Sequence, residues 1–175
     1  MKEVMTARMR LVLGTEPLAE AELEDNARLS TLLEAEVPAS WPPESLRDAL
    51  PVFLSNCKQR GSLGRWCLGW YGVLLADGKE TLCGSVGFKG GPTSSGMVEI
   101  GYSVLPAFQL RGIATEMVIG ASRWALAEPA VRAVEAEVRR DNRASMRVLE
   151  KAGFVLHGAG AELGTRRFRL ARVLP

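Results

Sequence analysis

A short basic turn, residues 109–114 (Gln-Leu-Arg-Gly-Ile-Ala), has the residue types and spacing of an anion-binding site. It follows residues 97–105, which are rich in β-branched and aromatic types, and precedes residues 112–126, whose apolar side chains recur at helical spacing. The first N–H groups of a helix have no intrahelical partners, and the helix dipole adds positive potential there. Gly112 lets an anion approach the backbone without meeting a Cβ, and Arg111 adds a positive charge. We therefore predict that this turn binds a phosphate-bearing ligand.

The spacing of this turn separates it from the other common phosphate loops. Neither G-x-x-x-x-G-K-[ST] nor G-x-G-x-x-G occurs in the chain, which disfavours a nucleoside triphosphate or a dinucleotide as the ligand. Residues 109–114 match Q/R-x-x-G-x-G/A after a strand instead. This pattern resembles the acetyl-CoA pyrophosphate loop of the GNAT superfamily of N-acyltransferases.

A second motif lies downstream of the turn. Residues 142–154 read N-R-A-S-M-R-V-L-E-K-A-G-F and resemble the motif N-x-x-S-x-x-[VL]-L-x-K-x-G-F of the RimJ/RimL-like branch. Residues 99–106 are similar to the strand that precedes the loop in the same branch. The two motifs occur in the expected order, so the chain resembles a RimJ/RimL-like N-acetyltransferase over residues 97–154.

The resemblance implies an activity and a cofactor. Acetyl-CoA would be the acyl donor, and a primary amine, of a small molecule or of a protein N-terminus, would attack it directly in a ternary complex. The residues that the resemblance places at the cofactor are Ser103, Val104, Gln109, Leu110, Arg111, Gly112, Ile113, Ala114, Thr115, Asn142 and Ser145.

Strand alternation singles out Glu99 as a candidate general base. Glu99 and Ser103 share one face of the strand predicted over 97–105, and the other face carries Val98, Ile100, Tyr102 and Val104. A carboxylate in the strand that leads into the anion turn is placed to take a proton from an attacking ammonium group. The alternative is a solvent-facing or salt-bridged glutamate. A backbone N–H near Val104 is a candidate for stabilising an oxyanion, if a bulge separates this strand from its neighbour.

The proton donor is less well defined than the base. In the resembling family the equivalent of Asn142 contacts the cofactor and the equivalent of Ser145 lies near the thiol, which makes Ser145 the candidate donor. Both residues also fit simple capping, in which an N-cap Asn and a Ser three positions later satisfy early helix N–H groups. The tyrosine that many relatives carry after the second motif is absent from residues 154–158. Tyr71 and His157 are the alternatives.

Length and composition indicate one globular domain spanning residues 1–175. The net charge of +2 is too small to indicate nucleic acid as a partner, and the C-terminal arginines are not interleaved with stacking aromatics. The three cysteines include no C-x-x-C pair, so we expect neither a disulfide framework nor a metal site. No apolar run approaches the length of a membrane span and no signal peptide is recognisable, so we expect a cytoplasmic protein without a membrane partner. A homodimer is an arrangement that the sequence leaves open.

The hydrophobic periodicities predict an α/β fold of the α+β type, with a mixed, mostly antiparallel central sheet flanked by helices. A single GNAT-like domain is what the resemblance implies. The expected helices cover residues 18–36, 44–60, 112–126 and 143–152. The expected strands cover residues 8–13, 66–76, 80–88, 97–105, 131–138, 154–157 and 165–173.

Two functional hypotheses follow. The first is an acetyl-CoA-dependent N-acetyltransferase, favoured by the presence of Glu99, Gln109, Gly112 and Asn142. The second is a noncatalytic acyl-CoA-binding or regulatory module that retains the fold, favoured by the missing tyrosine.

Overall fold

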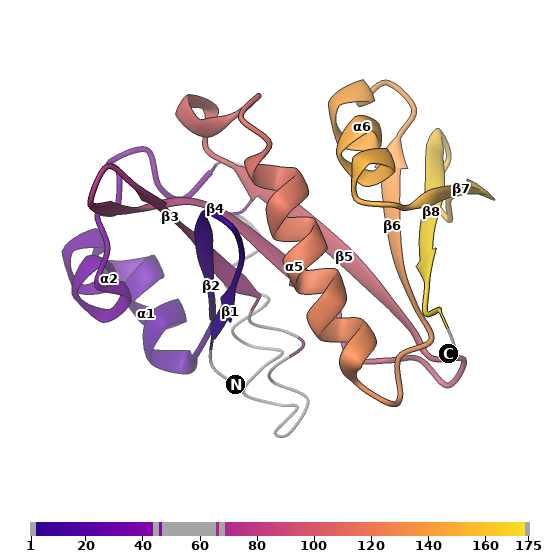
Figure 1. Ribbon diagram of the computed structural model, residues 1–175, viewed down its shortest axis with the longest axis horizontal. Helices are drawn as coiled ribbons and strands as arrows, with labels where there is room; N and C mark the ends of the chain where they lie inside the picture. The colour runs from indigo at the N-terminus through magenta and orange to yellow at the C-terminus, as the bar shows by residue number, and fades with distance from the viewer. Residues whose placement is uncertain (1–2, 44–45, 47–65, 67–68, 174–175) are drawn as a thin grey trace.

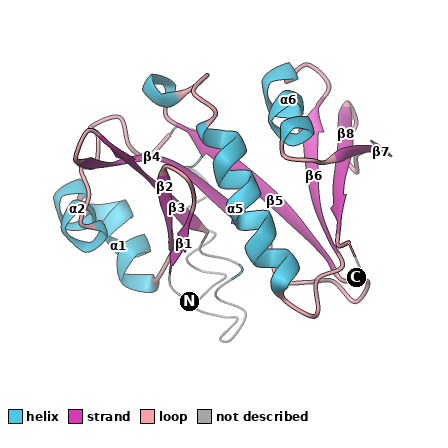
Figure 2. Cartoon of the chain, in the orientation of Figure 1, coloured by secondary structure: helices cyan, strands magenta, loops and turns pink. Residues whose placement is uncertain are grey.

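The computed structural model describes residues 3–43, 46, 66 and 69–173, and these contain one eight-stranded sheet (Figures 1 and 2). Its strands are β1 Glu3–Met5, β2 Met9–Leu13, β3 Trp70–Ala76, β4 Lys79–Phe88, β5 Met97–Val104, β6 Ala133–Arg139, β7 Val155–Ala159 and β8 Thr165–Ala171. They lie in the order β1-β2-β3-β4-β5-β6-β8-β7. The neighbours β5 and β6 are parallel and every other pair is antiparallel. The predicted mixed, mostly antiparallel sheet is confirmed.

Helices cover both faces of this sheet. The helical elements are α1 Glu16–Glu24, α2 Asn26–Leu33, η2 Pro106–Phe108, α5 Ile113–Ala127 and α6 Arg143–Lys151. Trp70 of β3 belongs to one buried cluster with Met117 of α5, whereas the next residue, Tyr71, belongs to a second cluster with Leu29 of α2. Because successive strand side chains point to opposite faces, α5 covers one face and α1 with α2 covers the other. No helix within the described ranges is long and apolar enough to cross a membrane.

The elements on either side of the predicted anion turn form close to their expected bounds. The helices predicted over 112–126 and 143–152 are α5 and α6, and the strand predicted over 97–105 is β5. The hairpin predicted from Asp77 and Gly78 connects β3 to β4, and both residues have positive φ angles, 52° and 71°, as a tight hairpin turn requires.

Other expectations were wrong or lie outside the described residues. The single helix expected over 18–36 is two helices, because the backbone of Asp25 is extended and its side chain accepts a hydrogen bond from the Ala27 N–H at 2.8 Å, capping α2. The strand expected over 66–76 begins at Trp70. The three-residue elements β1 and η2 were not predicted, since they are too short for a periodic pattern. The helix expected over 44–60 falls outside the described residues apart from Leu46.

Candidate active site

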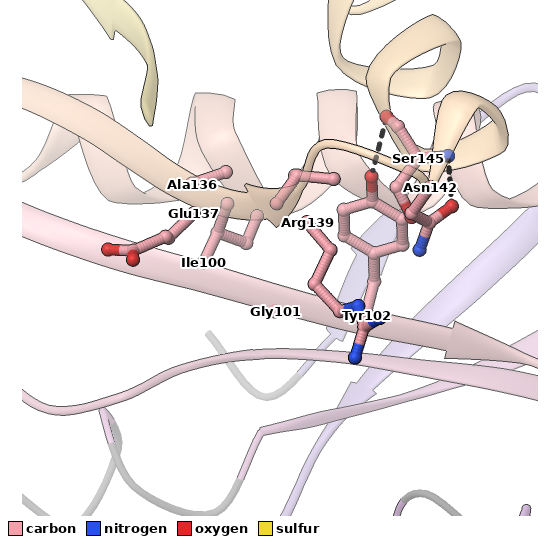
Figure 3. Close-up of a pocket in the computed structure, with 9 residues that line it drawn as sticks. Ile100, Gly101, Tyr102, Ala136, Glu137, Arg139, Asn142 and Ser145 are labelled. Carbon is pink, nitrogen blue, oxygen red and sulfur yellow. Dashed lines mark hydrogen bonds between the residues drawn. The ribbon is translucent and has the colours of Figure 1, made fainter. Parts of the chain in front are cut away.

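The parallel strands β5 and β6 separate at one end and leave a pocket between them. Their register pairs only Met97–Glu99 with Ala133–Glu135. The rest of β5, from Ile100 to Val104, pairs with β4 on its other side. A cavity of about 240 Å³ opens beside this part of β5 (Figure 3). The residues that line it come from β5, β6 and the start of α6: Ile100, Gly101, Tyr102, Ala136, Glu137, Val138, Arg139, Asn142 and Ser145.

Backbone groups of β5 point into this opening. The Leu105 N–H donates to the Cys83 carbonyl of β4 at 2.9 Å. Because the N–H groups of successive strand residues point to alternate sides, those of Tyr102 and Val104 point away from β4, towards the side where β6 has separated. The Val104 carbonyl accepts a hydrogen bond from the Gln109 Nε2 at 3.0 Å. The orientation suits the oxyanion role expected of an N–H near Val104, which stays a prediction.

The opening forms without a bulge in the central strand, the condition attached to the oxyanion role of an N–H near Val104. The register of β5 with β4 is continuous from Ile100 to Val104. An irregularity lies one strand away, between Gly72 and Val73 of β3. Across the opening, the Tyr102 hydroxyl donates a hydrogen bond to the Ser145 carbonyl. This part of β5 is therefore hydrogen-bonded to α6, because its backbone pairing with β6 has already ended.

The predicted anion turn has N–H groups available for a ligand. Leu110 and Gly112 have positive φ angles of 62° and 78°, and Gly112 is the N-cap of α5. In the described part of the chain, the N–H groups of residues 110–115 have no backbone acceptor. The next N–H group along the chain, that of Glu116, donates to the Gly112 carbonyl at 3.0 Å. The N–H groups of residues 110–115 are therefore available to an anion, as the start of a helix provides.

The side chains of the turn differ in their exposure. Gln109, Leu110, Arg111 and Gly112 are exposed, Ala114 and Thr115 are half-buried, and the Ile113 side chain is buried in the core. Ile113 can therefore serve a ligand through its backbone alone. The Arg111 guanidinium lies 5.9 Å from the centre of the Phe108 ring, close to the exposed amides.

Asn142 and Ser145 form the helix cap that one interpretation of the sequence predicted. The Asn142 Oδ1 accepts a hydrogen bond from the Ser145 N–H at 3.0 Å. Both residues also line the pocket (Figure 3). Capping and a role at the ligand are thus compatible, because the cap uses the backbone of Ser145 and not its hydroxyl.

Tyr102 is a pocket residue that the sequence reasoning missed. Its hydroxyl donates to the Ser145 carbonyl at 3.1 Å (Figure 3). Burial raises the pKa of Tyr102, although the hydrogen bond to Ser145 opposes this, so the phenol keeps its proton at neutral pH. Strand alternation placed Tyr102 opposite Glu99, but nothing in the sequence indicated that α6 would meet this face.

Glu99 lies on the other face of β5 from Tyr102 and does not line the pocket. Its side chain is 35% exposed and forms an ion pair with Lys89. The Lys89 N–H also donates to the Glu99 carbonyl at 2.9 Å, which fixes the backbone of both residues. Glu99 is a partly exposed, ion-paired carboxylate directly before the point where β5 and β6 separate.

The remaining residues considered for chemistry are placed differently. Ser103 is half-buried and faces Ser85 in the β4–β5 register. The hydroxyl of Tyr71 donates to the Glu22 carboxylate at 2.6 Å in a buried setting, so its proton is already committed. His157 is exposed on the edge strand β7. Neither Tyr71 nor His157 lines the pocket.

The central parallel pair of the sheet separates beside the predicted anion turn, so both the strand edge and the turn have N–H groups available to a ligand. This arrangement suits a ligand with phosphates at one end and an extended amide chain, and it is the arrangement expected of a GNAT-type acyltransferase.

Comparison with known proteins agrees with that class. The family model of the acetyltransferase (GNAT) domain matches residues 13–155. The chain therefore belongs to the acetyltransferase (GNAT) domain family and is an acyltransferase by class, which confirms the resemblance seen in the two motifs. It is also 29% identical over 160 residues to the uncharacterized N-acetyltransferase YjdG of Bacillus subtilis, covering 90% of this chain and 92% of that protein.

Solved structures share the fold at lower sequence identity. RimJ of Mycobacterium smegmatis, in complex with CoA-disulfide, has a TM-score of 0.65 at 21% identity, covering 97% of this chain and 87% of that one. RimL, a ribosomal L7/L12 alpha-N-protein acetyltransferase in complex with coenzyme A, has a TM-score of 0.63 at 17% identity, covering 97% of both chains. MccE, a microcin C7 self-immunity acetyltransferase in complex with acetyl-CoA and AMP, has a TM-score of 0.61 at 15% identity, covering 94% and 93%.

Proposed function

We propose that this protein is an acetyl-CoA-dependent N-acetyltransferase that acetylates a primary amine by direct attack in a ternary complex. The observation that carries the proposal is the separation of β5 from β6 directly before a turn with available N–H groups. Membership of the acetyltransferase (GNAT) domain family supports the same reaction class. In this proposal the whole activity resides in one domain spanning residues 1–175.

Residues of the turn and of the strand edge would hold acetyl-CoA. The N–H groups of residues 110–115 and the Arg111 guanidinium would bind its phosphates, as helix N-termini and arginines do. The N–H groups of Tyr102 and Val104 point away from β4, towards the side where β6 has separated, and an amide chain could extend the sheet there by one strand. Acetyl-CoA supplies an acetyl group activated as a thioester.

Positioning would provide the largest part of the rate enhancement. Holding an amine against an acyl donor contributes roughly 7 to 11 kcal/mol, whereas a single general acid or base contributes about 10²- to 10⁴-fold. Glu99 would take a proton from the ammonium group of the acceptor on the face opposite Tyr102, and the free amine would then attack the thioester. Ser145, a residue of the pocket whose backbone forms the helix cap, would donate a proton from its hydroxyl to the departing thiolate.

The acceptor is a primary amine of a small molecule or of a protein N-terminus. Among the solved structures that share this fold, RimL is described as an alpha-N-protein acetyltransferase, which supports a protein N-terminus as one possible acceptor. A panel of amines and of short peptides with free N-termini, assayed for acetyl-CoA-dependent thiol release, separates the two classes.

Calorimetry with acetyl-CoA tests the cofactor assignment. Wild-type protein should bind, and Gly112→Trp should not, because an indole at this N-cap occupies the approach to the N–H groups of residues 110–115. Gly78→Trp is the matched control, since Gly78 also has a positive φ angle, 71° against 78°, and a Cβ there meets nothing within 4 Å. Absence of binding by the wild type, or equal binding by Gly112→Trp and Gly78→Trp, contradicts the proposal.

A noncatalytic acyl-CoA-binding module is the second candidate. Residues 154–158 contain no tyrosine, and the hydroxyl of Tyr71 is committed to Glu22, which together favour it. Such a module would bind acetyl-CoA and release no thiol with any amine of the panel. Its function would also be unaffected by Glu99→Gln.

A further inference from the structure

Arg8, in the turn between β1 and β2, contacts the predicted anion turn of residues 109–114, although Arg8 and Arg111 are 103 positions apart in the sequence. Its Nη1 donates to the Arg111 carbonyl at 3.2 Å. Its Nε and Nη2 contact Oε2 of Glu116, in the first turn of α5, at 2.8 and 2.7 Å. A Cβ placed on Gly112 would lie 3.5 Å from Nη2, so this cation borders the space that the glycine leaves clear.

Glu116 is held in place by further contacts from the same β1–β2 turn. The Thr6 hydroxyl donates to its Oε1 at 2.6 Å and the Arg8 backbone N–H donates to the same atom at 2.7 Å. Burial alone would raise the pKa of Glu116, but the hydrogen bonds from Thr6 and Arg8 hold it below its ordinary value. Glu116 is therefore a fixed anion whose contacts orient Arg8.

A carboxylate in the first turn of α5 would by itself oppose phosphate binding, because it places negative charge beside the N–H groups of residues 110–115. The ion pair with Arg8 cancels that charge. A guanidinium has five N–H donors, of which Arg8 uses three on Glu116 and Arg111. Its side chain is 48% exposed, which leaves the remaining donors accessible from solvent.

We propose that Arg8 is a phosphate-binding residue of the cofactor site, oriented by Glu116 and Thr6 and supplying guanidinium N–H donors from the β1–β2 turn. The inference rests on the proposed function, because it assigns Arg8 to the phosphates of acetyl-CoA. Glu116 and Thr6 act as positioning residues, since they reach the ligand only through Arg8.

Steady-state kinetics with two acyl donors test this assignment. Arg8→Met should raise the KM for acetyl-CoA about 10- to 100-fold, the effect of losing a charge-assisted hydrogen bond, and leave kcat unchanged at saturation. With S-acetylpantetheine, which has no phosphate, Arg8→Met and wild type should have equal kcat/KM. Arg8→Lys keeps the charge but loses the fork of donors, so its KM should lie between the two. Arg28→Met, which removes the α2 arginine of an exposed ion pair with Glu24 of α1, is the matched control.

Glu116→Gln separates orientation from simple charge. If Glu116 orients Arg8, Glu116→Gln should raise the KM for acetyl-CoA in the wild-type background. In the Arg8→Met background it should lower the KM, because it then removes an unpaired carboxylate beside the phosphates. A lower KM in Glu116→Gln alone would show that Glu116 only repels the phosphates, and would overturn its assignment as a positioning residue.

Acetyl-dephospho-CoA identifies the phosphate that is bound. If the effect of Arg8→Met persists with this donor, Arg8 binds the pyrophosphate, and if it disappears, Arg8 binds the 3′-phosphate. An equal loss of kcat/KM with S-acetylpantetheine would mean that Arg8 only maintains the fold, which overturns the inference while leaving the proposed function intact. Absence of acetyl-CoA binding by the wild type would instead overturn the proposed function.

Discussion

Glu22 and Glu99 are carboxylates on the same face of the sheet with opposite surroundings. Glu22 of α1 is 6% exposed, and its two oxygens accept hydrogen bonds from the Trp41 Nε1 at 2.9 Å and the Tyr71 hydroxyl at 2.6 Å. The side chain of Glu99 is 35% exposed and forms an ion pair with Lys89. The first carboxylate is enclosed by neutral donors, and the second is partly exposed and ion-paired beside the point where β5 and β6 separate.

The difference in burial indicates that Glu22, and not Glu99, is a structural carboxylate. Burial raises the pKa of Glu22 to about 7, because loss of solvation outweighs the stabilising hydrogen bonds from Tyr71 and Trp41. Burial and the neighbouring carboxylate likewise raise the pKa of Tyr71, so this phenol stays protonated as a donor. A perturbed carboxylate is often taken as a sign of catalysis. Here the perturbed one anchors Trp41 to the sheet, and the candidate base is the accessible one.

The largest effect expected from this comparison is on turnover. Glu99→Gln should lower kcat about 10²- to 10⁴-fold, because the amide cannot accept a proton from the attacking ammonium group. Its affinity for acetyl-CoA in calorimetry should be unchanged, since Glu99 lies on the face of β5 opposite the pocket residue Tyr102. Glu24→Gln, at an exposed ion pair on α1, is the control and should retain wild-type turnover. If the kcat of Glu99→Gln is within threefold of the wild-type value, Glu99 is not the general base.

The next effect is on the pH dependence of stability and belongs to Glu22. Because its folded pKa, about 7, is above its ordinary value of 4.5, Glu22 takes up a proton more readily in the folded state than in the unfolded state. The contribution of Glu22 to the free energy of unfolding is fully present below pH 4.5 and is lost as the pH rises through about 7. The change corresponds to about 3 kcal/mol of unfolding free energy at 1.36 kcal/mol per pKa unit.

Urea unfolding of wild type and Glu22→Gln between pH 4.5 and 8 measures this contribution. Glutamine imitates the protonated carboxyl and can still accept from Trp41, so the wild type should lose stability relative to Glu22→Gln as the pH rises. Other titrating groups are common to both proteins and cancel in the difference. A difference that does not change with pH would show that Glu22 is not the enclosed carboxylate described above.

A smaller change in the unfolding free energy is expected when the hydrogen bond from Tyr71 to Glu22 is removed. Tyr71→Phe leaves a buried carboxylate oxygen without its partner and should lower the unfolding free energy by about 1 to 3 kcal/mol. The pKa of Glu22 should rise further, because the Tyr71 hydrogen bond lowers it. Turnover by the folded fraction should be retained. A large loss of kcat with normal stability would instead make Tyr71 the missing proton donor.

The sequence predicts the local features of the candidate site, and it does not predict the contacts between distant segments. The predicted anion turn and the Asn142 cap are local: each depends on residues within a few positions, such as Gln109 with Val104 or Asn142 with Ser145. Their geometry follows from turn and capping preferences that can be recognised in one short stretch.

The contacts that were missed join distant segments. Tyr71 bonds to Glu22 across 49 positions, Tyr102 to Ser145 across 43, and Arg8 to Glu116 across 108. Whether such residues meet depends on the order of the strands and on which face each helix covers, which periodicity alone does not fix. Alternation placed Tyr102 on its face of β5 correctly, but its partner could be named only once α6 was located.

The smallest effect is expected at the partner of Glu99. Lys89→Met removes an exposed ion pair and should change the unfolding free energy by less than about 1 kcal/mol, because exposed pairs contribute little. Turnover should be retained, since the Lys89 N–H still donates to the Glu99 carbonyl and keeps the base in place. Urea unfolding and amine kinetics of Lys89→Met, with Lys79→Met as an exposed control, measure both quantities. A loss above 2 kcal/mol would make Glu99 a structural carboxylate like Glu22, and the contrast between the two would then no longer identify the base.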